Sequence, residues 1–111
     1  MINLTTAEFK EKIFELGKGS EFKGSRPAVI DFYATWCSPC ITMGETLEKI
    51  SKEYPDVDFY KVDVDANFEV AQFLQIRGIP RVIYISKKDT VIEAGNRPAD
   101  EIRKNIQSIL W

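Results

Sequence analysis

Apolar residues recur along this chain with two alternating periods. Residues 28–33 are almost all apolar and residues 58–64 alternate between apolar and polar, which is typical of buried and half-buried strands. Residues 39–54 instead place apolar side chains three or four positions apart, as an amphipathic helix does. The whole pattern predicts the order strand, helix, strand, helix, strand, helix, strand, strand, helix. Strands interleaved with helices in this way predict an α/β layer architecture.

Capping and breaking residues set the expected element boundaries. Thr5 and Glu8 fit a capping box at the start of the first helix, and Gly17 and Gly19 are expected to end that helix. The expected strands are residues 2–4, 29–33, 58–64, 81–85 and 91–94, and the later helices are residues 39–54, residues 68–74 and one that opens at Pro98. The strand at 81–85 is expected to be central and to pair with 91–94 through a polar turn at 86–90.

Length and composition bound the domain organisation. The 111 residues, of which 44% are hydrophobic, suffice for one packed domain over residues 1–111 and are too few for two. The net charge is -2 and Lys87-Lys88 is the largest basic cluster, so nucleic acid is not an expected partner. No apolar stretch approaches membrane-spanning length. Residues 1–20 mix charged and apolar positions, which favours a cytoplasmic protein; loss of an upstream leader would instead allow a periplasmic or secreted one.

Both cysteines lie in one pentapeptide, Trp36-Cys37-Ser38-Pro39-Cys40, where a buried strand is expected to give way to a helix. A thiol with a pKa of about 8.5 is mostly protonated at neutral pH, whereas the positive end of a helix favours the thiolate. Cys37, at the expected N-cap, is therefore the predicted nucleophile. Cys40, one turn further along, is the predicted resolving thiol, and together they would carry out thiol–disulfide exchange.

Two other interpretations of the cysteine pair are open at this level. A structural disulfide that closes so short a loop would contribute only about 2 kcal/mol to stability. A zinc site needs about four ligands, and the chain has no histidine and no third cysteine, so no metal site is predicted.

The aromatic residues fall mostly at positions with core periodicity. Trp36 is the exception, because it precedes a cysteine that is expected to be exposed, and it is therefore expected to line a groove. The aromatic residues expected in the core are Phe9, Phe14, Phe32, Tyr33, Phe59, Phe68, Phe73 and Tyr84.

Several landmarks, in order along essentially the whole chain, resemble the thioredoxin family. The resembling segments are Ile2-Asn3-Leu4-Thr5, Asp31-Phe32-Tyr33-Ala34, the Trp-Cys-x-Pro-Cys unit at 36–40, Lys61-Val62-Asp63-Val64-Asp65, Arg77-Gly78-Ile79-Pro80, and Gly95 before the last helix. The resemblance implies the thioredoxin fold, which is a central mixed sheet of four or five strands flanked by helices on both faces. It also implies dithiol–disulfide exchange on protein substrates.

Two charged residues gain expected roles through this resemblance. Asp31 interrupts an apolar strand, so burial should raise the pKa of its carboxyl group. By resemblance it is the family's buried aspartate, which accepts the Cys40 proton through water. Lys61 stands where the family carries a lysine near that aspartate. Alternatively, Asp31 faces solvent at the end of the strand or forms a structural hydrogen bond. The alternative for Lys61 is a solvated lysine on a strand.

Pro80 begins a β-branched run that is expected to be a strand. Proline lacks the backbone N–H group that pairs strands, so it is normally found in a strand only at the first position. In the thioredoxin family this proline is cis and faces the cysteine pair, which leaves the backbone of Ile79 free to pair with an extended substrate. Gly78 and Gly95 would let the substrate chain approach closely. An ordinary trans turn proline is the alternative. The predicted substrate-binding residues are Trp36, Ser38, Pro39, Gly78, Ile79, Pro80, Arg81 and Gly95.

Some positions depart from the family pattern. Ser38 replaces the usual glycine, and we hypothesise that its hydroxyl group stabilises the attacking thiolate and makes the pair more oxidising. Ile41 replaces a common lysine or arginine, and Gly44-Glu45 replaces the region of a helix-kinking proline. Arg81 replaces a common threonine, and we hypothesise that it selects acidic substrate segments.

The resemblance implies no cofactor. The expected partners are disulfide-containing proteins and a thioredoxin reductase or another dithiol donor, with the protein itself a monomer. Two alternatives differ in function: an oxidase or isomerase outside the cytoplasm, and a non-catalytic scaffold. Scaffold versions often lose one cysteine, and this chain has both.

Overall fold

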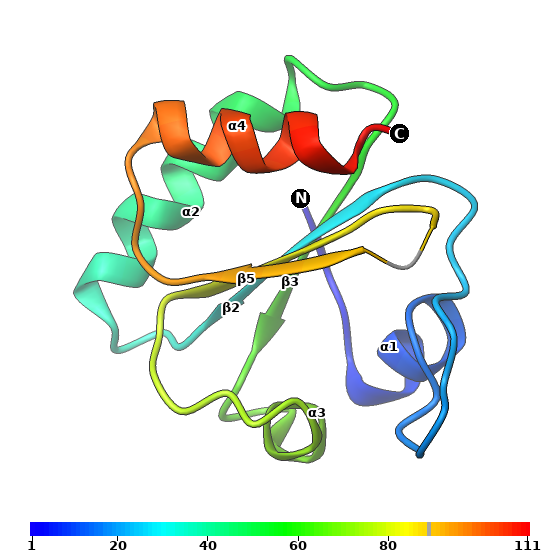
Figure 1. Ribbon diagram of the computed structural model, residues 1–111. Coiled ribbons are helices and arrows are strands. Elements are labelled where there is room, and N and C mark those ends of the chain that lie inside the picture. The colour runs from blue at the N-terminus through cyan, green and yellow to red at the C-terminus, as the bar shows by residue number, and fades with distance from the viewer. Residues whose placement is uncertain (89) are drawn as a thin grey trace.

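The computed structural model describes residues 1–88 and 90–111 and builds them around a five-stranded sheet (Figure 1). The strands are β1 Ile2–Asn3, β2 Ala28–Tyr33, β3 Asp58–Asp63, β4 Arg81–Ile85 and β5 Val91–Ala94. Their spatial order is β1-β3-β2-β4-β5. The first three strands run parallel, and β4 pairs antiparallel with both β2 and β5. The predicted mixed sheet is confirmed, although the central strand is β2 and not β4, which lies beside it.

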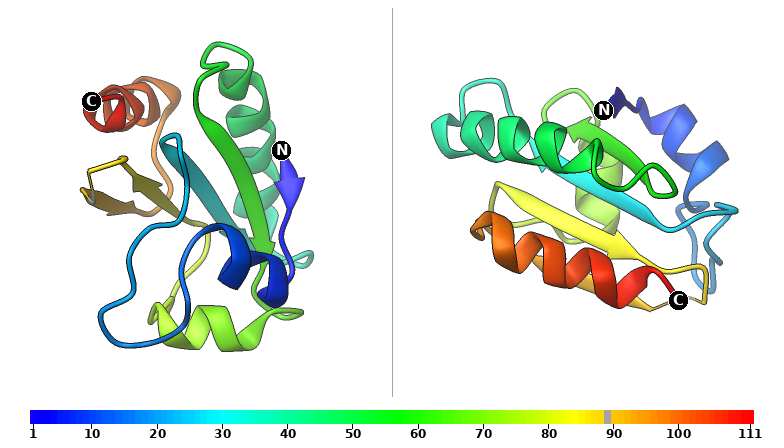
Figure 2. Two further views of the ribbon diagram at one scale, coloured as in Figure 1. Left: turned by 90° about the vertical axis from the view of Figure 1, so that its right-hand side faces the viewer. Right: turned by 90° about the horizontal axis from the view of Figure 1, so that it is seen from above.

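Within the described residues, four helices cover the two faces of the sheet (Figures 1 and 2). On one face lie α1 Thr6–Lys12 and α3 Phe68–Phe73, and on the other lie α2 Ser38–Ser51 and α4 Ala99–Ile109. The predicted turn between β4 and β5 includes residue 89, which lies outside the described residues.

The alternation of side chains along β2 assigns its residues to the two layers. Val29 belongs to the apolar core beneath α2 and α4, whereas Ile30 and Phe32 belong to the core beneath α1 and α3. Successive side chains of a strand point to opposite faces. Asp31 therefore shares the face of Val29 and points toward α2, the helix that begins at the cysteines.

The first helix starts as expected and ends earlier. The capping box is present, because Glu8 N donates to Thr5 Oγ1 at 3.1 Å and Thr5 N donates to Glu8 Oε1 at 3.0 Å. The expected end at Gly17 and Gly19 is wrong, since α1 ends at Lys12.

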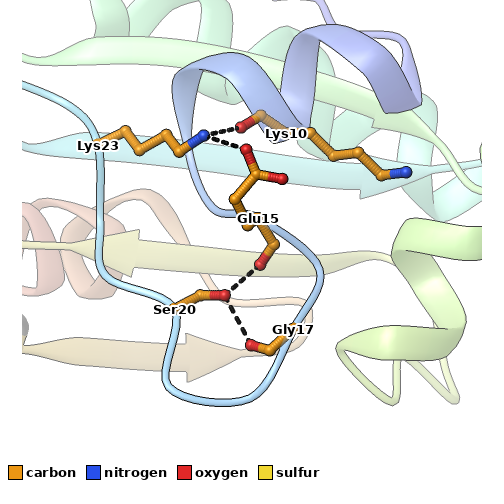
Figure 3. A network of polar contacts seen from close by, with 5 residues as sticks. All are labelled: Lys10, Glu15, Gly17, Ser20 and Lys23. Atoms are coloured by element: carbon orange, nitrogen blue, oxygen red, sulfur yellow. Dashed lines mark hydrogen bonds and ion pairs between the residues drawn. The ribbon is translucent and has the colours of Figure 1, made fainter.

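A polar network in the loop that follows α1 accounts for the early end (Figure 3). Ser20 Oγ donates to the carbonyl oxygens of Glu15 and Gly17 at 2.5 and 2.6 Å. Lys23 Nζ donates to the carbonyl oxygen of Lys10 at 2.7 Å and forms an ion pair with the Glu15 carboxylate. Carbonyl groups at a helix end lack partners within the helix. Here Lys23 satisfies the Lys10 carbonyl group of the last turn, and its backbone N–H group donates to the carbonyl oxygen of Ile13 at 2.8 Å. Ser20 holds the loop beyond the helix in its non-helical path.

Two aromatic residues predicted for the core lie at the surface. Phe68 is 68% exposed and Phe73 is 41% exposed. The six-residue helix α3 buries Val70 and Ala71, and side chains at its two ends fall off that narrow face. The second helix also differs slightly from the expected 39–54, because it runs from Ser38 to Ser51.

Candidate active site

The two cysteines lie at the N-terminus of α2 and form a disulfide, with their Cα atoms 5.2 Å apart. Cys37 is the N-cap residue in an extended conformation, and Pro39 occupies the first turn. The Cys37 carbonyl oxygen accepts hydrogen bonds from the backbone N–H groups of Cys40 at 3.1 Å and Ile41 at 3.3 Å. The pair therefore meets at the positive end of a 14-residue helix.

Cys37 is buried, whereas the sequence predicted it to be exposed. Its relative exposure is 5%, and that of Cys40 is 3%. Both side chains pack in a small apolar cluster with Ala34, against which Ile79 also packs. The flanking Ser38 is exposed, so the disulfide is covered by its neighbours while the chain around it faces solvent.

Asp31 is buried behind the cysteines, with 1% of its surface exposed. Its Oδ1 atom has no hydrogen-bond partner among the described residues. Burial raises the pKa of the Asp31 carboxyl group to about 7, because desolvation disfavours the charged form, and the positive charge of Lys61 opposes this rise.

Lys61 is the direct neighbour of Asp31 in the register of β2 and β3. Its Nζ atom lies 5.6 Å from the centroid of the Tyr33 ring, within the range of a cation–π interaction. The lysine therefore acts on Asp31 through its charge, and no ion pair joins the two side chains among the described residues.

A cavity of about 670 Å³ joins these groups to the surface. Asp31, Cys40 and Lys61 line it, and the exposed residues Ile41 and Glu45 of α2 also contribute to its lining. Sequence reasoning gave no role to Gly44, which leaves room in this cavity. A Cβ atom added there would lie 3.9 Å from Asp31 Oδ2. Asp31 and Cys40 therefore share one space on the α2 side of the sheet.

The segment before β4 forms a second hollow next to the cysteines. The Ile79-Pro80 peptide bond is cis, as the family resemblance implied, and Ile79 packs on the cysteine cluster. A hollow of about 180 Å³ is lined by Trp36, Val64, Ile76, Arg77, Gly78 and Ile79. Trp36 is 70% exposed, which agrees with a groove-lining position.

Asp65 orients Trp36, a contact that sequence reasoning missed. Trp36 Nε1 donates a hydrogen bond to Asp65 Oδ2 at 2.7 Å. Because β2 and β3 are parallel, residues just past their carboxyl ends meet at the same edge of the sheet. Asp65 follows β3 and Trp36 follows β2, so the order of the strands was the signal that could have paired them.

The remaining predicted groove residues lie in the segments around Pro80 and at the start of α2. Cβ atoms added at Gly78 and Gly95 would meet no atom closer than 3.9 Å, so both positions leave open space. Arg81 is partly buried at the start of β4, and Pro39 is exposed at the start of α2. The structure thus brings the cysteines, Asp31 and the cis-proline segment together.

A disulfide at a helix N-terminus, a buried carboxyl group behind it and an adjacent cis-proline segment define a protein of thiol–disulfide exchange. A family model described as thioredoxin matches residues 1–108. The chain therefore belongs to the thioredoxin family, whose members are disulfide oxidoreductases, and Cys37 and Cys40 are its redox-active pair.

Relatives of known sequence agree with this assignment. The chain is 40% identical over 87 residues to the thioredoxin of Borreliella burgdorferi, an alignment that covers 76% of this chain and 74% of that protein. It is 42% identical over 94 residues to the thioredoxin-like protein CITRX, chloroplastic, of Solanum tuberosum, covering 79% of this chain and 54% of that protein. The chain thus spans about half the length of such chloroplastic relatives.

Solved structures share the fold over nearly the whole chain. The thioredoxin of Fasciola hepatica superposes with a TM-score of 0.81 at 31% identity, covering 98% of this chain and 99% of that one. The oxidised mitochondrial thioredoxin 3 of Saccharomyces cerevisiae also gives 0.81, at 30% identity and with 97% and 94% coverage. No helix formed by residues 1–88 or 90–111 has the length and hydropathy that a membrane crossing requires.

Proposed function

We propose that this protein reduces disulfides in other proteins, with Cys37 as the attacking thiol and Cys40 as the resolving thiol. The observation that carries this assignment is the different placement of the two residues. Cys37 caps α2, where the helix N-terminus stabilises a thiolate. Cys40 lines the cavity that contains Asp31, where a base is available to it.

The proposed reaction has two exchange steps. The Cys37 thiolate attacks one sulfur of a substrate disulfide, that bond breaks, and the substrate's second sulfur leaves as a thiolate and takes up a proton. Cys40 then loses its proton and attacks the Cys37 sulfur, which releases the first substrate sulfur. The substrate gains two electrons and two protons, and the protein is left with the Cys37–Cys40 disulfide.

Asp31 is the proposed acceptor of the Cys40 proton. A base works best when its pKa lies near the working pH, and burial places that of Asp31 at about 7. We assign to Lys61 the role of a positioning charge that keeps part of the Asp31 population ionised at neutral pH, since its charge lowers the Asp31 pKa.

The hollow beside the cis-proline is the proposed place for the substrate. Ile79 would pair its backbone with an extended substrate segment, and Trp36 would contact the segment's side chains. Ser38 and Pro39 are exposed between the cysteines, and Gly78 and Gly95 leave open space in the segments that precede Pro80 and follow β5. An extended chain bound there would bring its disulfide toward Cys37.

The proposed partners follow from this chemistry. Each cycle leaves the protein oxidised, so a thioredoxin reductase or another dithiol donor must return two electrons to it. We propose a monomer that works in the cytoplasm on disulfide-containing proteins. Fractionation of cells and measurement of the molar mass in solution test these two points.

Two cysteine variants test the roles of the thiols. Reduced Cys40→Ser should accumulate a covalent adduct with a disulfide-containing substrate such as insulin, because attack occurs and resolution does not. Cys37→Ser should form little adduct and reduce no substrate. Mass spectrometry under non-reducing conditions detects the adducts. Adducts that accumulate in Cys37→Ser and are absent from Cys40→Ser would reverse the assignment.

The direction of exchange is tested by the reduction potential of the cysteine pair. Equilibration against a glutathione series, followed by Trp36 fluorescence, gives this potential. A value clearly below the glutathione poise of the cytosol is expected for a reductant. A value well above it would replace the proposed reductase with an oxidase or isomerase.

A further inference from the structure

Two arginine side chains reach the surface beside Pro80. A Cβ atom added at Gly78 would lie 4.0 Å from Arg81 Nη2. A Cβ atom added at Gly95 would lie 3.9 Å from Arg97 Nη1 and 3.9 Å from the Pro80 carbonyl oxygen. Both guanidinium groups therefore border the open space that the proposed function assigns to an extended substrate.

These two guanidinium groups are only loosely engaged within the protein. Arg81 Nε lies 3.5 Å from Glu93 Oε1 and is buried without a hydrogen-bond partner among the described residues. Arg97 Nε lies 3.5 Å from Glu101 Oε2, and the hydrogen bond from Arg97 Nη1 goes to the carbonyl oxygen of Asn96 at 3.1 Å. Partly exposed ion pairs of this kind contribute about 0–1 kcal/mol to stability. A carboxylate of the substrate with better geometry can therefore replace Glu93 or Glu101 as the partner of the arginine.

The arginine that joins α4 to the turn after α2 looks different. Arg103 of α4 donates from Nε and Nη2 to the two carboxylate oxygens of Glu53, at 2.9 and 2.8 Å. This two-pronged geometry engages both oxygens of the carboxylate. Arg81 and Arg97 lack such a partner in the described part of the chain, although both lie near a glutamate.

Two hollows that contain arginine have no acidic residue among the described residues that line them. The hollow beside Trp36 contains the exposed Arg77. The other hollow, of about 360 Å³, lies between α2 and the loop before α4 and is lined by Arg97 together with Asn96, Thr42 and Thr46. The residues that line these two hollows therefore supply positive charge and neutral hydrogen-bonding groups, while the nearby carboxylates of Asp65, Glu93 and Glu101 already have partners within the protein. Such a lining complements a segment with negative charge.

We propose that Arg81 and Arg97 bind acidic side chains that flank the disulfide of the substrate. This inference rests on the proposed function and extends the hypothesis for Arg81 to a pair of arginines, which border the open space at Gly78 and at Gly95. A carboxylate can receive two parallel N–H hydrogen bonds from a guanidinium group. The arginines act on the approach and orientation of the substrate, and they take no part in the transfer of electrons or protons.

Two peptides with the same intramolecular disulfide provide the test, one with glutamates and one with glutamines beside the cysteines. Stopped-flow measurement of Trp36 fluorescence gives the second-order rate constant for their reduction. At low salt the reduced protein should react about tenfold faster with the glutamate peptide, at about threefold for each arginine, and high salt should weaken this preference. Arg81→Gln and Arg97→Gln should each lower the rate constant for the glutamate peptide about threefold. The double variant should react equally fast with both peptides.

Lys52→Gln is the matched control, because it removes one positive charge at the far end of α2 from the cysteines. This variant should keep the preference, and its loss there would assign the effect to net charge and overturn the inference. Equal rates for both peptides, or a preference that survives in the double variant, would also overturn it. Failure to reduce either peptide contradicts the proposed function instead. If Arg81→Gln unfolds, the exposed Arg97→Gln alone decides the matter.

Discussion

Asp31 links the stability of this protein to its chemistry through a single buried carboxyl group. The residue is 1% exposed, lacks a partner for Oδ1 among the described residues, and has a pKa of about 7 instead of its ordinary 3.8. At pH values between 3.8 and about 7, the Asp31 carboxyl group is therefore protonated in the folded state and ionised in the unfolded state. Stability is full below the lower pKa and is lost progressively as the pH rises through the folded pKa.

Asp31→Asn should therefore stabilise the oxidised protein in a pH-dependent way. Near pH 8 the substitution removes a buried charge. The difference between a folded-state pKa of about 7 and the ordinary 3.8 means that this charge lowers the free energy of unfolding by about 4 kcal/mol at most. Near pH 4 the native carboxyl group is already neutral, and the gain should be small. Urea unfolding at both pH values measures the difference. An equal gain at both would show that ionisation of Asp31 is not its cause.

The same substitution should slow the second exchange step selectively. General base catalysis contributes on the order of 10²-fold or more, so decay of the mixed disulfide in Asp31→Asn should slow by about that factor at neutral pH. Its formation by Cys37 should change little. In the unmodified protein, the decay rate should rise with pH through about 7, where Asp31 ionises. Rapid-quench measurements of both steps test this, and equal slowing of the two steps would contradict the role of Asp31.

The element that carries the active site is α2, and its glycine relates helix stability to the cavity. Gly44 lies in the interior of α2 and faces Asp31 across the cavity. A glycine in a helix interior costs about 1 kcal/mol relative to alanine. The glycine therefore keeps space beside the carboxyl group at the expense of helix stability.

Gly44→Ala should raise the free energy of unfolding by about 1 kcal/mol. The added methyl group would contact Asp31 Oδ2 at 3.9 Å, an ordinary van der Waals distance, so no clash opposes the gain. It should also displace solvent and raise the pKa of Asp31 further. Urea unfolding near pH 4 isolates the helix effect, and NMR titration of the carboxyl group reports the pKa. An unchanged pKa would mean that Gly44 does not control access of water to Asp31.

The capping box of α1 is a second device at the scale of one element. Thr5→Ala removes the acceptor for Glu8 N and should destabilise the protein by about 1 kcal/mol. Thr42→Ala is the matched control, because the same chemical change at an exposed position within α2 should stabilise slightly through helix propensity. Thermal unfolding of both variants measures the effects. Equal signs for the two changes would contradict the capping argument.

At the scale of the whole molecule, one sheet is shared by two apolar cores. Leu47 lies in the core beneath α2 and α4, and Leu4 lies in the core beneath α1 and α3. Neighbouring residues of β2 contribute to opposite cores, so neither core can form without the sheet. We therefore propose that residues 1–111 fold as one cooperative unit.

Leu47→Ala and Leu4→Ala test this cooperativity with the same change in the two cores. Each residue is at most 2% exposed, and each substitution should cost about 2–5 kcal/mol. Both should shift one transition in which Trp36 fluorescence and far-UV circular dichroism coincide. Separate transitions by the two probes would show that the cores unfold independently.

Features that depend on neighbours in the chain were predictable from the sequence. The Thr5 and Glu8 capping box, the start of a helix at the cysteines and the burial of Asp31 in an apolar strand all appear as expected. The fold class followed from the alternation of periods and from the family resemblance. These features share a cause, since the spacing of a few consecutive residues determines them.

The tertiary structure alone determined the features that depend on where the chain returns. At the end of α1, the carbonyl oxygen of Lys10 accepts from Lys23, and this hydrogen bond forms only after the loop folds back. Arg97 lies beside Pro80 because β5 pairs antiparallel with β4, which brings residues distant in sequence to one edge. The spacing of residues in the sequence predicts local conformation, whereas contacts between distant residues depend on how the whole chain folds. The chemistry of the cysteine pair could therefore be predicted from the sequence. The residues proposed to select its substrates could be identified only from the tertiary structure.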